Sequence, residues 1–311
     1  VPVPGIDRGR RAVSSPPMLQ TYDERNRDLK LWIDGRLVHR DEAGVSPFDS
    51  SVQNGDAVWE GLRLYDGRIF MLEAHLARLR RGARALRYEG VPTDAEIIDA
   101  LRRTLAANGM RDGVHVRLTL SRGVKYTSGL DPRLNTRGCS LFILAEFKPP
   151  VYDRGGIRLV TAGVRRPSAD VLDQTIHSCN QLTSILAKLQ ANAAGADDAM
   201  MLDTRGFLAE TDATHLFLVE DGVVCTPRTV ACPEGITRAV VLELCREHGI
   251  AGREEDITPA RVWRAEEMFC TGTMGELVPV LEVDGRAVGG PEAGPVTRRL
   301  TELFRERTRT G

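Results

Sequence analysis

Apolar residues recur with two different periods along the first half of the chain. Leu72–Leu86 carries apolar side chains at helical spacing, and Asp94–Ala107 does the same behind Thr93, a residue suited to cap a helix. Val114–Ser121 instead alternates apolar and polar residues, which is typical of a half-buried strand, and Cys139–Phe147 is more continuously apolar. The pattern therefore predicts two helices and two strands in this region.

Two Asp-Gly pairs lie inside apolar runs closer to the N-terminus. Asp34-Gly35 separates residues 31–33 from residues 37–38, and Asp66-Gly67 divides Leu62–Phe70 in the same way. Asp-Gly favours the two-residue turns that join antiparallel strands. We expect two hairpins to open the first domain.

A concentration of proline and glycine at residues 149–156 lies between two apolar segments and is the best candidate for a domain boundary. It divides the chain into a small domain over residues 29–148, an interdomain linker over 149–156 and a larger domain over 157–311. Residues 1–28 are rich in Pro, Arg, Ser and Asp without apolar periodicity, so we expect a flexible or draped N-terminal arm there.

The larger domain also mixes strands and helices. The pattern predicts a strand at Ile157–Ala162, a helix at Asn180–Ala194, a hairpin pair around Ala199–Asp203 and Leu216–Cys225, and a helix at Thr237–His248. The predicted fold class is therefore mixed α/β (α+β) with two domains.

Composition excludes several classes of function. The 311 residues are 42% hydrophobic and 27% charged with a formal net charge of -1, so we expect no nucleic-acid partner. No run of eighteen apolar residues occurs, and the first twenty residues lack the apolar segment of a secretory signal. We therefore expect a globular cytoplasmic protein without a membrane partner.

The six cysteines are spread along the chain without a Cys-x-x-Cys pair. This spacing is typical of neither a zinc site nor a disulfide framework, so we expect no metal and mostly reduced, buried thiols. Nearly all basic residues are arginines, and the only lysines are Lys30, Lys125, Lys148 and Lys188. Few amines are therefore available for covalent chemistry with an aldehyde.

Five short motifs together carry a resemblance to a known family. They are Gly55–Arg63, His75–Leu79, Glu210, Gly235–Arg238 and Thr271–Thr273. None is specific alone, but in this order and spacing they resemble the class IV aminotransferases. These are pyridoxal-phosphate (PLP) enzymes of fold type IV, which include branched-chain aminotransferases, D-amino-acid aminotransferases and aminodeoxychorismate lyase.

The resemblance implies a small N-terminal α/β domain, a larger C-terminal pseudo-barrel, a cofactor between them and a homodimer. It also implies that the cofactor phosphate is held by Arg78, by backbone N–H groups of Ile236 and Thr237, and by Thr273. Such a set is chemically reasonable, because a helix N-terminus and an arginine both favour a dianion. Glu210 matches the carboxylate that pairs with the pyridinium nitrogen and keeps the ring electron-withdrawing.

One position departs from this family in a way that changes the chemistry. The family reads Ile-Lys-Ser-Leu-Asn-Tyr-Leu where residues 176–182 read Ile-His-Ser-Cys-Asn-Gln-Leu, so His177 replaces the cofactor lysine and Gln181 a tyrosine. The lysine both holds the cofactor covalently and moves a proton. Imidazole serves only as a base. We therefore expect PLP or its amine form, pyridoxamine phosphate (PMP), to bind noncovalently, with His177 as the base.

Three other functions remain open from the sequence. The fold could serve cofactor-independent chemistry through His177, Cys179 and His215, the chain could be an ordinary aminotransferase, or it could be a noncatalytic scaffold. Another lysine could replace the missing one. A continuous helix would place Lys188 about 16 Å along the axis from His177, too far for its side chain to reach the cofactor. Lys125 lies on a loop that could border the pocket.

Two further residues bear on the substrate. Arg117 matches a position that helps to bind the substrate carboxylate in some class IV enzymes, and Trp59 replaces a usual phenylalanine at the pocket wall. The expected partner is therefore a small or medium amino or keto acid.

Overall fold

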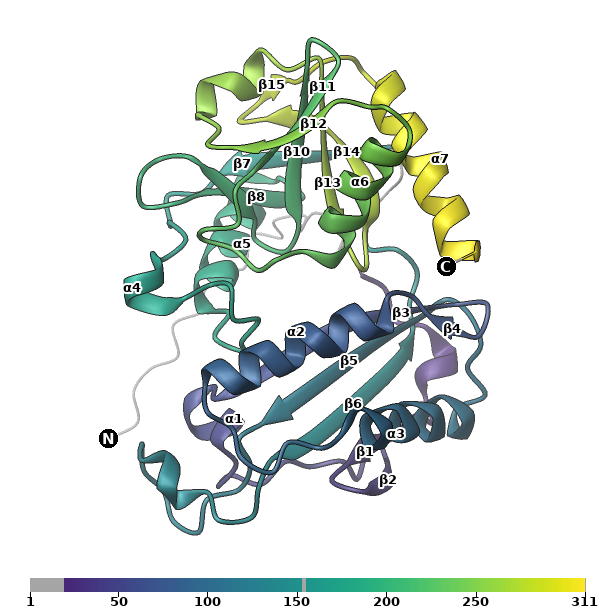
Figure 1. Ribbon diagram of the computed structural model, residues 1–311, viewed down its shortest axis with the longest axis vertical. Coiled ribbons are helices and arrows are strands. Elements are labelled where there is room, and N and C mark those ends of the chain that lie inside the picture. Colours follow the sequence, from purple (N-terminus) through teal and green to yellow (C-terminus); the bar gives the residue numbers. More distant parts are fainter. Residues whose placement is uncertain (1–19, 153–154, 311) are drawn as a thin grey trace, which may run out of the picture.

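The computed structural model describes residues 20–152 and 155–310, which form two lobes facing each other (Figure 1). The first lobe is built on a six-stranded antiparallel sheet in the order β2-β1-β6-β5-β3-β4. Its strands are β1 (Lys30–Ile33), β2 (Arg36–His39), β3 (Ala57–Tyr65), β4 (Arg68–Ile69), β5 (Val114–Ser121) and β6 (Ser140–Phe147). Its helices are α1 (Ser50–Asn54), α2 (Leu72–Ala85) and α3 (Asp94–Ala107).

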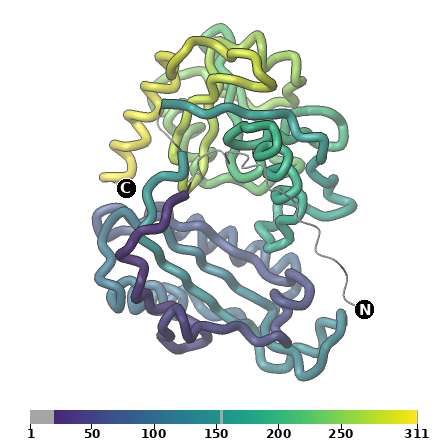
Figure 2. Tube along the Cα trace, turned by 180° about the vertical axis from the view of Figure 1, so that it is seen from behind, coloured from purple at the N-terminus to yellow at the C-terminus, as the bar shows by residue number. Residues whose placement is uncertain are grey.

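Helices α2 and α3 cover one face of this sheet, and the view from behind shows the strands in front of them (Figure 2). The core between helices and sheet is apolar and includes Leu62, Leu79, Ile97 and Leu118. Each such side chain contributes roughly 1.5–3 kcal/mol by leaving water. Thr93 caps α3 as predicted, in a capping box with Glu96.

The second lobe is a nine-stranded sheet in the order β12-β11-β10-β13-β14-β7-β8-β9, with β15 beside β14. Its strands are β7 (Ile157–Thr161), β8 (Asp198–Leu202), β9 (Leu208–Thr211), β10 (His215–Glu220), β11 (Val223–Pro227), β12 (Gly252–Glu255), β13 (Glu267–Gly272), β14 (Glu276–Val283) and β15 (Arg286–Ala287). Its helices are α4 (Ala169–Leu172), α5 (Leu182–Ala194), α6 (Ile236–Glu247) and α7 (Pro295–Thr310).

The second sheet curls on itself, because β9 runs directly into β10 although the two strands lie far apart in the strand order. This confirms the expected mixed α/β class with a pseudo-barrel in the second lobe. The predicted hairpin pair is present as β8–β9 and β10–β11.

Helix α5 begins two residues later than predicted, at Leu182. The residues before it are used by the other lobe: Ser178 forms a β-bridge with Val58, and the Cys179 N–H donates to the Ala57 carbonyl at 2.8 Å. These contacts between the lobes fix the segment that carries His177.

The arm expected over residues 1–28 lies mostly outside the described residues. Its last part contains a short 3-10 helix, Glu24–Asn26, whose Asn26 is buried. The Asn26 side-chain amide donates to the Phe147 carbonyl at 2.9 Å, and the Phe147 N–H donates back to Asn26 at 2.9 Å. This part of the arm is therefore fastened to β6.

All six cysteines are unpaired, and four of them are buried. Among the helices of the described residues, none has both the length and the apolar character needed to cross a membrane.

Candidate active site

A cavity of about 980 Å³ opens between the two lobes. Its lining includes all eight residues that the sequence placed at the site: Trp59, Arg78, Arg117, His177, Glu210, Ile236, Thr237 and Thr273. The structure thus brings together residues that lie up to 214 positions apart in the sequence.

Strand alternation explains how the first lobe contributes to this cavity. Side chains of successive strand residues point to opposite faces of the sheet. Trp59, on β3, and His115 and Arg117, on β5, line the cavity, while Leu62 and Leu118 pack in the core beneath α2 and α3.

His177 is held through both its backbone and its ring. The Trp59 N–H donates to the His177 carbonyl at 3.0 Å, and the imidazole stacks on the Trp59 indole with 4.2 Å between ring centroids. His177 Nδ1 lies 2.6 Å from the Trp59 carbonyl oxygen. Because a carbonyl only accepts, Nδ1 carries the proton and Nε2 the lone pair of the neutral ring.

The surroundings of His177 favour this neutral form. Burial lowers the pKa of His177, and this effect exceeds the opposing influence of Glu60. Within the described residues no hydrogen bond reaches Nε2. His177 therefore presents an unprotonated nitrogen on a cavity wall, which is what a general base requires.

Glu60 is a fully buried carboxylate that joins three basic side chains. Arg78 donates to it at 2.8 and 2.7 Å, His75 Nδ1 lies 2.6 Å away, and His177 Nδ1 lies 3.7 Å away. Burial opposes its charge, but hydrogen bonds from Arg78, His177 and His75 outweigh burial and hold the pKa of Glu60 well below its usual range. Glu60 thus orients Arg78 and His177; sequence reasoning missed it.

The N-terminus of α6 forms one end of the cavity. The helix begins at Ile236 with Gly235 as its N-cap, and no side chain caps it. Its first N–H groups therefore remain available for an anion, and the Thr237 and Thr273 side chains line the same region.

Arg78 adds a positive charge beside this helix N-terminus. Its Nη1 donates to the Glu234 carbonyl at 2.7 Å, directly before Gly235, while the rest of its guanidinium is bound by Glu60. The arginine therefore bridges the lobes and holds its charge in a fixed place beside the start of α6.

Glu210, on β9, is buried, and its Oε1 accepts no hydrogen bond although Arg166 Nη2 lies 2.9 Å away. Burial raises the pKa of Glu210 to about 7, and Arg166 only partly offsets this. No pattern in the sequence points to Arg166, because its partner lies 44 positions away in a different element. Glu210 is therefore an acid whose ionisation depends on what occupies the cavity.

Arg117 lies over the Trp59 indole, with its guanidinium carbon 3.4 Å from the ring centroid. Its Nη2 lies 3.7 Å from Cys179 Sγ, and within the described residues no carboxylate pairs with it. Burial lowers the pKa of Arg117. A partly buried arginine without a carboxylate partner is suited to bind an anionic group of a ligand.

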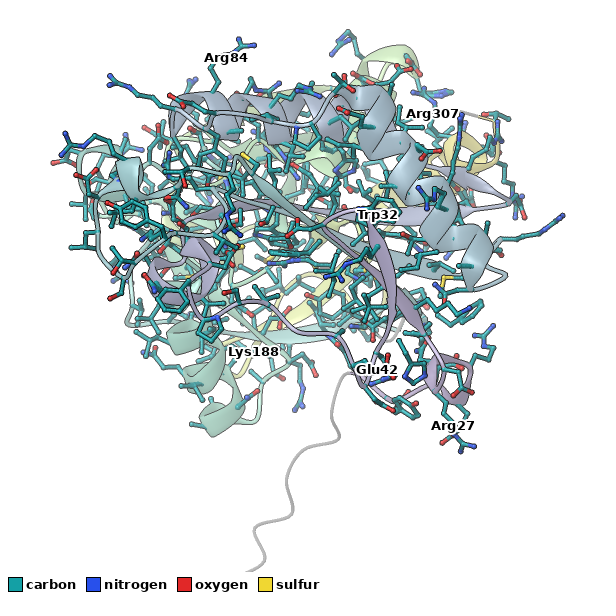
Figure 3. The ribbon with its side chains drawn as sticks, turned by 90° about the horizontal axis from the view of Figure 1, so that it is seen from below. Arg27, Trp32, Glu42, Arg84, Lys188 and Arg307 are labelled. Carbon is teal, nitrogen blue, oxygen red and sulfur yellow. The ribbon has the colours of Figure 1, made fainter. Side chains whose placement is uncertain are left out.

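The continuous helix assumed in placing Lys188 is absent, because α5 begins only at Leu182, and Lys188 lines the cavity. Its amine is held by the Asp198 carboxylate and the Asp197 carbonyl; Figure 3 labels Lys188 on its helix. Lys148 also lines the cavity, whereas Lys125 binds Asn54 at 2.6 Å and does not. Lys148 and Lys188 therefore both line the cavity, although neither occupies the position of the family's cofactor lysine.

Comparison with known proteins agrees with the motifs. The family model for amino-transferase class IV matches residues 57–283. The chain belongs to the class IV aminotransferase family. A putative branched-chain-amino-acid aminotransferase of Methanocaldococcus jannaschii is 41% identical to this family member, over 91% of the chain and 98% of the relative.

Other relatives of this class IV family member point the same way. A branched-chain-amino-acid aminotransferase-like protein 2 of Arabidopsis thaliana is 50% identical over 94% of the chain, which spans only 52% of that longer protein. The solved branched-chain aminotransferase of Thermoproteus uzoniensis superposes with a TM-score of 0.82 at 31% identity, covering 90% of this chain and 94% of the other. The family and its fold are thus established.

Proposed function

We propose that this class IV family member binds PLP or PMP noncovalently and transfers an amino group between an amino acid and a keto acid, with His177 as the base. The observation that carries the proposal is the hydrogen bond from His177 Nδ1 to the Trp59 carbonyl at 2.6 Å. It leaves Nε2 of a neutral imidazole free on the cavity wall.

The residues present fit such a cofactor. The Glu210 carboxylate, which lines the cavity, matches a pyridinium N–H, and the uncapped start of α6 with Arg78 matches a phosphate. Solved branched-chain aminotransferases carry PMP or, in the protein of Thermobaculum terrenum, PLP, which supports the same ligand class. When bound, the cofactor supplies an electron-withdrawing ring that stabilises charge on the substrate carbon.

The side chains of the cavity then have separate roles. His177 Nε2 would move a proton from the substrate carbon to the cofactor, the Trp59 carbonyl keeps the opposite ring nitrogen protonated, and Arg117 binds the substrate carboxylate. Trp59 supports both the imidazole and the guanidinium by stacking. His177, Trp59 and Arg117 all line the cavity, which supports these roles.

An ordinary aminotransferase with a covalent lysine is the second candidate, because Lys188 and Lys148 both line the cavity. The Lys188 amine is already engaged by the Asp198 carboxylate and the Asp197 carbonyl, so it is not free to attack an aldehyde. We therefore rank this function below the first.

Replacing Glu210 by Gln tests the proposal. The amide has the same shape but no charge, so we expect PMP affinity to fall about tenfold to a hundredfold, since a hydrogen bond to a charged group contributes roughly 1.5–3 kcal/mol. Glu220→Gln is the matched control: Glu220, at the end of β10, binds Arg261 away from the cavity. Titration of each purified variant with PMP gives the affinities. Equal affinity in both variants would count against the cofactor assignment.

We expect the pH dependence of the rate to report His177. Burial lowers its pKa, so Nε2 stays unprotonated at neutral pH and the rate falls only when the pH drops below the ordinary histidine range near 6.5. A lowered pKa also means that stability decreases in the same direction. Single-turnover rates from pH 5 to 8 should therefore be measured beside circular dichroism. Because Glu210 has a pKa of about 7, the same profile is measured in PMP-saturated Glu210→Gln, and a rate that still falls between pH 8 and 7 in that folded variant would contradict this role.

We also propose a homodimer in which α5 meets a second copy. One face of α5 is apolar and exposed: Leu182, Ile185 and Leu189 are 67%, 54% and 57% exposed. Such a contiguous apolar stripe is typical of an interaction surface. We expect Leu189→Glu to halve the mass in sedimentation, whereas Arg84→Glu on α2 leaves it unchanged. A monomeric unaltered chain would contradict the proposal.

A further inference from the structure

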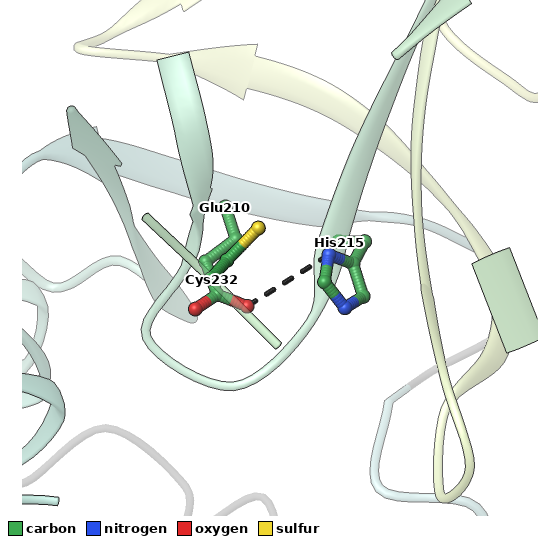
Figure 4. A group of neighbouring side chains, drawn as sticks. All are labelled: Glu210, His215 and Cys232. Atoms are coloured by element: carbon green, nitrogen blue, oxygen red, sulfur yellow. Dashed lines mark ion pairs between the residues drawn. The ribbon is translucent and has the colours of Figure 1, made fainter. Parts of the chain in front are cut away.

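Three metal-binding side chains meet in the second lobe: Glu210, His215 and Cys232 (Figure 4). One ligand atom from each lies within 4.8 Å of the other two, and all three residues are buried. His215 Nδ1 lies 3.9 Å from Glu210 Oε2. The pattern of cysteines in the sequence does not predict this cluster, because its members come from separate segments.

The three groups are short of partners. Glu210 Oε1 lies 2.9 Å from Arg166 Nη2 but accepts no hydrogen bond, and within the described residues neither the His215 ring nor the Cys232 thiol takes part in one. Buried polar groups nearly always have a hydrogen-bond partner, so such a set calls for an explanation. A bound cation would give the His215 ring and the Cys232 thiol a partner and would share the Glu210 carboxylate with Arg166.

The scaffold holds the cluster rigidly. Glu210 lies on β9 and His215 begins β10, and the turn between them is closed by the Thr211 N–H donating to the Thr214 carbonyl at 2.7 Å. The loop with Cys232 comes close because residue 235 is glycine: a Cβ there would lie 2.2 Å from the His215 ring. Ligands fixed on strand ends and a tight loop need little rearrangement to bind.

We infer that Glu210, His215 and Cys232 form a binding site for a zinc-type divalent metal ion. One oxygen, one nitrogen and one sulfur donor match the ligand set of Zn²⁺, and three protein ligands leave the fourth position open. Glu210 and His215 line the cavity, from which an ion could enter.

The ligands can carry the charge that a dication needs, but neighbouring arginines weaken its binding. Burial lowers the pKa of His215 well below its usual range, so its ring is the neutral form that binds metal. The ion would bind Glu210 as a carboxylate and Cys232 as a thiolate, although burial raises the pKa of Cys232 well above its usual range and that of Glu210 to about 7, so binding would release protons. Arg166, 2.9 Å from Glu210, opposes the ion, as do the charges of Arg78 and Arg238 near the His215 ring. We therefore expect weaker binding than in a closed structural zinc site.

Metal and cofactor would share one ligand, an expectation that rests on the proposed function. The same Glu210 carboxylate would serve the metal and the pyridinium nitrogen. A dication there removes the carboxylate's charge and repels the protonated ring, so metal and cofactor should exclude each other. Metal binding itself does not depend on the cofactor.

Equilibrium dialysis of the cofactor-free protein against Zn²⁺, followed by metal analysis, tests the site. We expect one ion per chain, and at least about tenfold weaker binding in Cys232→Ala and His215→Asn, because even partners outside the ligand shell change metal affinity by that much. Cys245→Ala, which removes another buried thiol, is the control and should bind as before. No bound zinc, or equal binding in all variants, would overturn the inference.

The absorption spectrum of bound Co²⁺ is measured on the unaltered chain, so this test does not depend on whether a variant folds. Co²⁺ bound to the unaltered chain should show thiolate-to-metal absorption in the near ultraviolet, and a spectrum without it would overturn the role of Cys232.

To test whether metal and cofactor exclude each other, the protein is titrated with PMP in the presence of chelator and in the presence of Zn²⁺. We expect zinc to weaken PMP binding in the unaltered chain but not in Cys232→Ala. Equal PMP affinity with zinc and with chelator in the unaltered chain would overturn the mutual exclusion. Failure to bind PMP even with chelator would count against the proposed function and leave the zinc result standing.

Discussion

His177→Ala should lose amino-group transfer while keeping both fold and cofactor affinity. General-base catalysis contributes about 10²–10⁴-fold to a rate, so we expect a loss of that size in kcat. The phosphate end and Glu210 lie on other elements, so PMP should bind within a few-fold of the unaltered chain. Steady-state rates and a PMP titration on the same preparation check both expectations.

The matched control for this variant is His248→Ala. His248 is an exposed histidine at the end of α6, away from the cavity lining, and its removal should change neither value. If His177→Ala keeps full activity, another group is the base. If it loses PMP binding together with activity, His177 serves the pocket's structure instead of the chemistry.

His177→Lys should convert the pocket to covalent binding. The backbone of residue 177 is fixed by the Trp59 N–H, and burial beside Arg78 lowers the pKa of an amine there, so the lysine is nucleophilic near neutral pH. With excess PLP we expect a coloured adduct that borohydride fixes to the peptide containing residue 177. Absorption spectra and peptide mass spectrometry detect it.

Lysines 148 and 188 are the controls for this experiment. The adduct should persist when His177→Lys is combined with Lys188→Arg and should map only to residue 177. A variant that stays colourless after prolonged incubation with excess PLP would show that the cavity does not hold the cofactor as we propose.

Local periodicity predicts those elements whose two faces differ in polarity. Helices α2 and α3 and strand β5 fall where the pattern places them, because each is buried on one side. Strand β13 is buried at almost every position and therefore shows no alternation. The start of α5 is decided by a contact with β3, about 120 positions earlier, which no local pattern contains.

The same distinction applies to the site. Residues that belong to short motifs, such as Arg78 and Thr237, could be named from the sequence, and they line the cavity. Glu60 also lies within a short motif, but its partners, like those of Arg166 and Cys232, come from other segments, so only the folded chain reveals what these residues contact. The tautomer of His177 likewise depends on the Trp59 carbonyl, a backbone group that a sequence pattern does not specify.

The most direct test of noncovalent binding uses the unaltered protein. It is saturated with PLP, treated with borohydride, digested and mapped by mass spectrometry, while an untreated sample is denatured with acid to measure released cofactor. We expect about one cofactor released per chain and no reduced adduct on Lys148 or Lys188. A stoichiometric adduct on either lysine would contradict the role given to His177 and make this protein an ordinary lysine-dependent aminotransferase.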